Sequence, residues 1–157
     1  MPEDPEPTGD ERELFLRWLV YLRESLLTRL DDIDEAQARW TPDGKLIQLL
    51  GIVNHLAHVE RRWTDGVYLG GAFSRSEEEF RVPVGRTIAE IVADYRAAAA
   101  NTEAVVRAAP STNDLCRSDT HPGIDLRWVL IHLVEETARH AGHADATREL
   151  LDGKTGD

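Results

Sequence analysis

Several side chains that could bind a metal or carry a proton recur within one stretch of the chain, residues 125–151. They are His132, Glu136, His140 and His143. The stretch contains no proline and has the periodicity of one long helix, in which successive residues are turned by about 100°. On that helix these side chains fall within a stripe about 80° wide. A histidine and a carboxylate one turn apart project together, so they can hold one divalent cation.

The polar stripe merges with the apolar face of the same helix. That face is formed by Val129, Leu133, Thr137, Ala144 and Leu151. A polar stripe that borders a buried face is not typical of a helix that is merely solvated. Glu136 and His140 lie nearest to the apolar face, which favours them as ligands. His132 and His143 flank the stripe, where each could orient a ligand by a hydrogen bond or could serve in packing.

A second helix, expected over residues 45–69, carries two further histidines, His55 and His58. On the helical wheel His55 lies about 60° nearer to the buried face than His58, so it is the better ligand candidate. Glu60 falls inside the apolar face, where an acid needs a partner or must be neutral. Three roles are open for Glu60: orienting a ligand, forming an ion pair, or lining a polar pocket.

Composition narrows the classes of function. The chain of 157 residues has a formal net charge of −11, which argues against a nucleic-acid partner and against docking on an anionic membrane. Its single cysteine, Cys116, excludes an intrachain disulfide and fits a reducing cytoplasm. Cys116 has no histidine motif around it, which favours an inert thiol over a nucleophile. The start of the chain does not resemble a signal peptide, and no apolar stretch reaches membrane-spanning length.

The chain is expected to form one all-α domain. Residues 1–9 are acidic and rich in proline, which predicts a disordered tail, and residues 10–157 form the domain. Long helices are expected at residues 10–31, 45–69, 87–109 and 125–152, with no strand between them. They predict a four-helix bundle. The connections 70–86 and 110–123 are long, so not all neighbouring helices are simple antiparallel hairpins.

Segments of the chain resemble the DinB-like superfamily. They are residues 126–156 (LRWVLIHLVEETARHAGHADATRELLDGKTG), 45–63 (KLIQLLGIVNHLAHVERRW) and 87–100 (TIAEIVADYRAAAA). Within them, the runs RHAGHAD and HLAHVERRW are specific signals when they occur together. The resemblance covers residues 10–156 and is greatest to the actinobacterial branch known as mini-circle protein.

The resemblance implies a four-helix bundle with the unusual helix order up-down-down-up. It also implies a divalent metal held by three histidines, one on the second helix and an HxxxH pair on the last. On this chain the second-helix ligand falls on His55 and the second histidine of the pair on His140, but the first falls on Glu136. Two histidines and one carboxylate still form a competent set for zinc, with nickel or iron as alternatives.

The same resemblance implies a thiol-dependent transferase, in which a low-molecular-weight thiol, mycothiol in actinobacteria, attacks an electrophilic small molecule. Glu60, His132 or His143 would then act as the catalytic base or would orient a reacting group. Arg139 and Arg148 could hold a carboxylate or phosphate of a substrate, although ion pairs along the helix are the simpler role for both.

Two other functions stay open from the sequence. One is a metal-dependent hydrolase that activates water, and the other is a non-enzymatic stress-response or binding module on the same bundle. The expected partners are small molecules, and a homodimer is left open.

Overall fold

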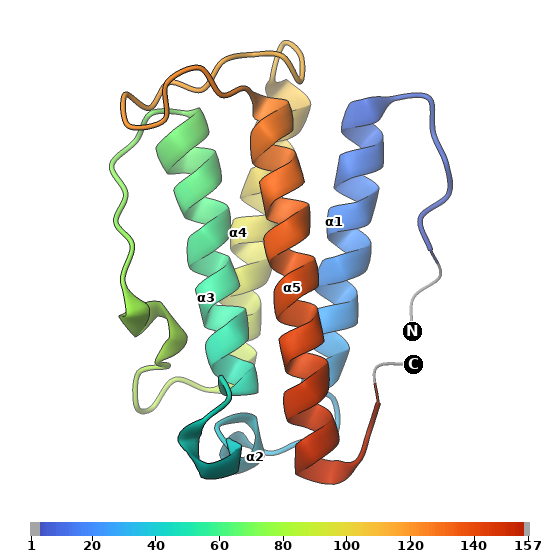
Figure 1. Ribbon diagram of the computed structural model, residues 1–157, viewed down its shortest axis with the longest axis vertical. Coiled ribbons are helices and arrows are strands. Elements are labelled where there is room, and N and C mark those ends of the chain that lie inside the picture. Colours follow the sequence, from blue (N-terminus) through green and yellow to red (C-terminus); the bar gives the residue numbers. More distant parts are fainter. Residues whose placement is uncertain (1–3, 156–157) are drawn as a thin grey trace.

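The computed structural model describes residues 4–155, which form a helical bundle (Figure 1). Its helices are α1 (Glu11–Leu27), α2 (Glu35–Ala38), α3 (Leu49–Arg61), α4 (Ile88–Ala108) and α5 (Leu126–Asp152), with 3-10 turns at Thr28–Leu30, Pro42–Gly44 and Glu77–Phe80. Residues 4–155 contain no strand. The predicted all-α bundle of four long helices is thus confirmed. The predictions for residues 1–3 of the tail and for residues 156–157 lie outside the described residues.

The long helices follow the order up-down-down-up that the resemblance implied. α1 and α5 run in one direction, and α3 and α4 run in the other (Figure 1). An ion pair of Glu11 with Arg127 joins the N-terminal ends of α1 and α5, and one of Arg61 with Asp94 joins α3 to α4. Because α3 and α4 are parallel, residues 69–87, called here the crossover segment, must return along the bundle beside α3 (Figure 1).

Side chains and one glycine fix where the long helices begin and end. Asp10 at the start of α1 and Asp125 at the start of α5 accept hydrogen bonds from backbone N–H groups of the first turn. α4 begins with a capping box, in which Thr87 and Glu90 bond reciprocally to each other's backbone. α5 ends at Gly153, whose φ of 78° lies in the left-handed region that glycine adopts at little cost.

The second long helix differs from its prediction. Instead of one regular helix over residues 45–69, α3 begins at Leu49, and its α-helical part ends at Arg61. Arg62–Tyr68 continue it as a π-helix, whose wider turns change the direction of the following side chains. A period of 3.6 residues cannot reveal such a segment, because the wider turn is set by tertiary packing. π-Helical turns are frequent at functional sites.

Apolar side chains from all four long helices form the core, and a charged pair is buried within it. Arg23 of α1 donates to both carboxylate oxygens of Glu60 of α3, at 2.8 and 3.0 Å. Their side chains are 4% and 2% exposed. The bidentate geometry satisfies both charges, so Glu60 is a partner in a buried ion pair between α1 and α3.

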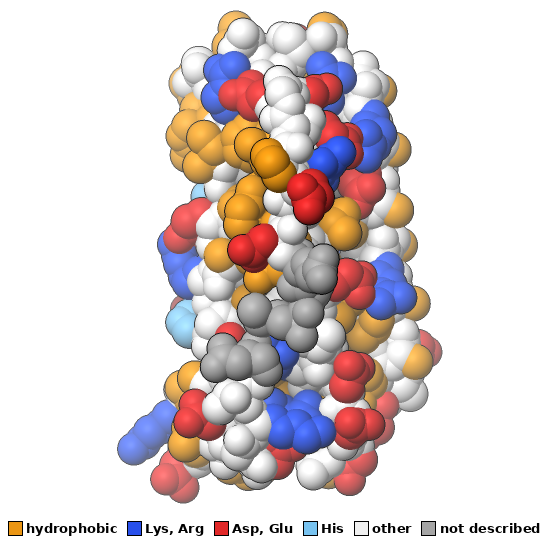
Figure 2. Space-filling view, turned by 90° about the vertical axis from the view of Figure 1, so that its right-hand side faces the viewer, with side chains coloured by type: hydrophobic (Ala, Val, Ile, Leu, Met, Phe, Trp, Pro, Cys, Tyr) orange, Lys and Arg blue, Asp and Glu red, His pale blue; other side chains and the backbone are white. Residues whose placement is uncertain are grey.

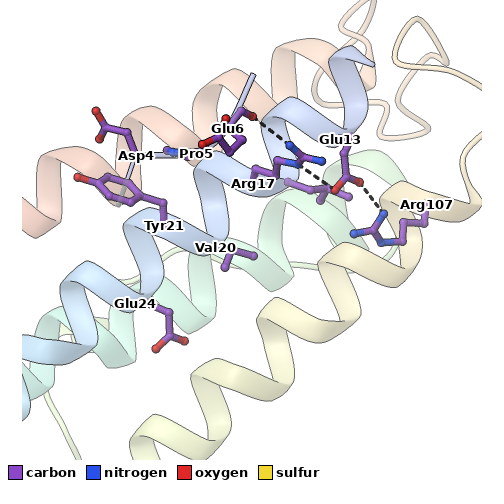
Figure 3. Close-up of a pocket in the computed structure, with 10 residues that line it drawn as sticks. Asp4, Pro5, Glu6, Glu13, Arg17, Val20, Tyr21, Glu24 and Arg107 are labelled. Carbon is purple, nitrogen blue, oxygen red and sulfur yellow. Dashed lines mark hydrogen bonds and ion pairs between the residues drawn. The ribbon is translucent and has the colours of Figure 1, made fainter. Parts of the chain in front are cut away.

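Residues 4–9 have no regular secondary structure and lie along α1. Arg17 of α1 donates to the backbone carbonyl of Glu6 at 3.0 Å, and the two residues border a pocket that Val20 and Tyr21 also line (Figure 3). Charged side chains of both signs are spread over this face of the molecule, with apolar ones between them (Figure 2). No helix among the described residues is long and apolar enough to cross a membrane.

Candidate metal centre

His55 on α3 and the pair Glu136 and His140 on α5 meet where these helices pack together. Glu136 Oε2 lies 3.8 Å from His55 Nε2 and 3.6 Å from His140 Nε2, and the three ligand atoms all lie within 4.8 Å of one another. In a tetrahedral zinc site with bonds of about 2.0–2.1 Å, neighbouring donor atoms are about 3.3 Å apart. The three residues therefore fit one small divalent cation with little movement.

The ring of His55 is oriented by a carboxylate from the crossover segment. Glu79 Oε2 lies 3.1 Å from His55 Nδ1, while Glu79 Oε1 accepts a hydrogen bond from the guanidinium of Arg62. A carboxylate in this position accepts the Nδ1 hydrogen and leaves the lone pair of Nε2 directed toward Glu136. Metal-ligating histidines have such a partner almost without exception, so Glu79 supports the assignment of His55 as a ligand.

Close packing of the crossover segment against α3 positions Glu79. Asn54 donates to the backbone carbonyl of Glu79 at 2.7 Å, and the ring of Phe80 stacks on His55 with 3.9 Å between centroids. Gly51 makes this approach possible, because a Cβ there would lie 2.3 Å from the backbone oxygen of Phe80. The segment thus forms part of the site even though it has no long helix of its own.

Burial keeps the two candidate imidazoles neutral. It lowers the pKa of His55 from 6.5 to about 4, with a further decrease from His140, and these effects outweigh the carboxylates of Glu79 and Glu136. Burial also lowers the pKa of His140. For Glu79, burial acts to raise the pKa, but the hydrogen bond and charge of Arg62 outweigh it and hold the pKa below its usual range. At pH 7 both imidazoles are therefore in the form that binds a metal.

Glu136 is shared between the two histidines and a surface arginine. Its Oε1 accepts a hydrogen bond from Arg139 at 2.8 Å, while its Oε2 faces the histidines. Arg139 is 52% exposed and also pairs with Glu135. The structure thus places Arg139 as an ion-pair partner that orients Glu136, and not as a cation free to bind a substrate.

A pocket of about 190 Å³ opens beside the candidate ligands. Its walls include Trp63, Phe73, His121 and His132 as well as His55 and Glu136. The ring of His132 lies 4.3 Å from that of Trp63 and 5.3 Å from that of Trp128. Burial lowers the pKa of His132, so its ring is neutral at pH 7. This pocket gives the site a mostly aromatic wall with a neutral base in it.

Other residues that the sequence singled out lie elsewhere. Glu60 is held in the ion pair with Arg23 and does not line the pocket, which favours the ion pair among the roles that the sequence left open for it. Arg148 is 2% exposed and is bound by Asp152 and by the backbone carbonyls of Arg29 and Asp31, which follow α1. It ties α5 to the segment after α1, which favours the ion-pair role over substrate binding. Sequence reasoning placed both residues on the correct helix, but their partners lie far away in sequence.

Two further histidines that the sequence considered, His143 and His58, lie outside the pocket. His143 is exposed, and its ring lies 5.3 Å from that of His140 without lining the pocket. His58 is exposed, and its Nδ1 lies 2.8 Å from the backbone oxygen of Asn54. Of the proposed bases, only His132 lines the pocket. His55, and not His58, lies beside Glu136 and His140, and its role as a ligand stays a prediction.

Cys116 has no features of a nucleophile. Burial, with Asp125 and Asp114 nearby, raises the pKa of its thiol to about 11. The thiol is therefore protonated at pH 7, and its sulfur is a weak nucleophile. The prediction of an inert thiol is consistent with this environment.

Sequence reasoning missed the residues that the crossover segment and the π-helix supply. They are Arg62, Trp63, Phe73, Arg75 and Glu79. The length of the segment was the one available signal, because long connections in compact domains are often functional. Nothing in its composition indicates which of its acids reaches His55.

Comparison with known proteins agrees with this fold. The sequence model of the mycothiol-S-transferase family matches residues 14–153, which confirms the DinB-like resemblance. The crystal structure of a conserved protein from Enterococcus faecalis superposes with a TM-score of 0.71 over 94% of this chain and 100% of that one, at 18% identity. That likeness shows the fold alone. No curated protein matches the chain, and the mini-circle branch stays a prediction.

Proposed function

This chain belongs to the mycothiol-S-transferase family, and from that membership we propose that it is a metal-dependent enzyme that transfers a low-molecular-weight thiol to an electrophile. Family membership supports a thiol of the mycothiol type as one substrate. The observation that carries metal dependence is the convergence of His55, Glu136 and His140 within 4.8 Å at the wall of a pocket. Zinc suits this ligand set, with nickel and iron as alternatives.

In this proposal His55, Glu136 and His140 hold the cation. Once bound, a divalent cation would supply Lewis acidity, which favours the thiolate form of a thiol at neutral pH. Glu136 makes the ligand set less positive than three histidines would, which weakens the effect on the thiol pKa. Glu79 keeps His55 in the tautomer whose Nε2 is free to ligate.

His132 is the best candidate for the group that accepts the thiol proton. It lines the pocket, and burial lowers its pKa, so a ring nitrogen is available as an acceptor at pH 7. A substrate that fills the pocket would displace water from these aromatic side chains, which would strengthen the electrostatic interactions inside it. His132→Gln should therefore lower kcat for thiol transfer by about 100-fold while leaving the metal content unchanged.

The test is a transferase assay on the untagged protein with mycothiol and 1-chloro-2,4-dinitrobenzene. We expect product formation that requires both the thiol and the metal, that is lost on chelation and that returns when zinc is added. Hydrolysis of an activated ester without thiol, at a rate above that of thiol transfer, would favour a hydrolase instead. Absence of both activities in the metal-loaded protein would contradict the proposal.

A further inference from the structure

The pocket beside the candidate ligands contains an uncompensated positive charge. Arg62 is paired with Glu79, and Arg139 outside the pocket is paired with Glu135 and Glu136. Arg75 also lines the pocket, and within residues 4–155 the structure shows no hydrogen bond or ion pair for its side chain. Arg75 is exposed, and a guanidinium that no acid within residues 4–155 engages is available to pair with an anion. Its position at the pocket therefore points to an anionic group of a ligand.

Aromatic rings, tilted by 46–67° to one another, form much of the rest of the pocket wall. Trp63 stands beside His132 at 4.3 Å and beside His121 at 5.2 Å between ring centroids, and Phe73 follows at 6.0 Å from His121. Gly66 allows Phe73 to approach, since a Cβ there would lie 2.5 Å from its ring. A planar conjugated group can stack on one such ring while it meets a neighbouring ring edge-on. A volume of about 190 Å³ is small among ligand pockets, so it suits one of two reactants.

We propose that this pocket binds the electrophile, and that it selects a planar conjugated electrophile carrying a carboxylate or similar anionic group. The ring stacks against Trp63 and His132, and the anion pairs with Arg75. This arrangement would hold the reacting carbon near His55 and Glu136. This inference rests on the proposed transferase function for the reaction, but the binding that it predicts does not depend on turnover.

A chloronitrobenzoate illustrates the step. The thiol gives its proton to a base in the pocket, and its sulfur forms a bond to the ring carbon that carries chlorine. The carbon–chlorine bond then breaks with its electron pair, and chloride leaves. No oxidant or reductant is needed.

The decisive experiment is a calorimetric titration of the metal-loaded protein with 3-nitrobenzoate and with 3-nitrobenzamide, unreactive ligands that differ mainly in charge. We expect the benzoate to bind roughly tenfold more tightly. In Arg75→Gln the benzoate should bind only as tightly as the amide, whose affinity should be unchanged. The matched control is Arg81→Gln, because Arg81 lies on the same crossover segment but pairs with Glu78. This control should keep the wild-type preference.

Several results would overturn the inference. They are equal affinities in the wild type, no binding of either ligand, or a preference that survives in Arg75→Gln. A preference that disappears when the metal is removed would show that the carboxylate binds the metal and not Arg75. Trp63→Leu should lower the affinity for both ligands about tenfold. Thermal unfolding of this variant checks that it is folded. Transferase activity with neutral electrophiles could persist in every one of these cases, so failure here is distinguishable from failure of the proposed function.

Discussion

Glu79 Oε2 lies 3.1 Å from His55 Nδ1, although the two residues are 24 positions apart and only His55 belongs to a long helix. The crossover segment therefore completes the surroundings of a ligand carried by α3. The packing of the segment and the geometry of the site are coupled, because the backbone carbonyl of Glu79 accepts a hydrogen bond from Asn54 of α3 and the ring of Phe80 stacks on His55.

Removing the charge of Glu79 should weaken the metal site without emptying it. Glu79→Gln keeps the shape of the side chain but no longer favours the Nδ1 hydrogen of His55, so we expect a 10- to 100-fold loss of zinc affinity, the usual effect of such a partner. Competition with a zinc chelator measures it. Glu78→Gln is the control, because Glu78 is exposed and its side chain pairs with Arg81, away from His55. Equal zinc affinities of the two variants would show that Glu79 does not support the metal site.

The close approach at Gly51 can be tested by adding one methyl group. Gly51→Ala would clash with the backbone of Phe80, so it should lower the free energy of unfolding by about 1–3 kcal/mol and should weaken metal binding. Gly142→Ala is the matched control on α5, since nothing lies within 4 Å of its added Cβ. It should raise stability by about 0.5–1 kcal/mol. Denaturant unfolding of both variants measures whether each substitution lowers or raises the free energy of unfolding.

The helical wheel predicted much of the site, because a helix fixes the directions of its side chains locally. Neighbouring turns of α5 determine how Glu136 and His140 lie relative to each other, and the buried face of α3 selects His55. The wheel cannot say which helices pack together, so it could not distinguish Glu60 in an ion pair from Glu60 at a site. The partner Arg23 lies 37 positions away.

The crossover segment is different, because it has no periodicity from which its contacts could be read. Glu79 reaches His55 only because α3 and α4 are parallel and the chain must return between them. The π-helix likewise depends on packing and not on the local pattern, so the positions of Trp63 and Arg62 required the structure.

Loss of Glu60 should reduce stability without affecting the metal. Glu60→Ala leaves the buried Arg23 with Glu103 as its remaining ion-pair partner, on one side of the guanidinium only, and the loss of the buried bidentate pair should cost about 3 kcal/mol in the free energy of unfolding. Replacing both partners by Leu and Met should recover most of this loss. Denaturant unfolding and zinc content are measured on the same samples. Loss of zinc from a folded Glu60 variant would show that Glu60 contributes to the metal site.

The metal-free protein should lose stability on mild acidification. Since the pKa of His55 is about 4 in the folded state against 6.5 ordinarily, the unfolded state takes up the proton first as the pH falls. The contribution of His55 is complete above pH 6.5 and is lost between pH 6.5 and 4, by about 3 kcal/mol. Unfolding in urea at several pH values should show a shallower decrease for His55→Gln. The same slope in both proteins would contradict the lowered pKa.

The central claim is that His55, Glu136 and His140 hold one divalent metal, and elemental analysis after reconstitution with zinc tests it most directly. We expect about one zinc per chain in the wild type and in His58→Ala, whose exposed side chain lies on the same helix. His55→Ala and Glu136→Ala should each lose most of the zinc, and Glu136→His should retain it as a three-histidine site. A wild type that never holds zinc, nickel or iron, or equal zinc in all four variants, would contradict the account.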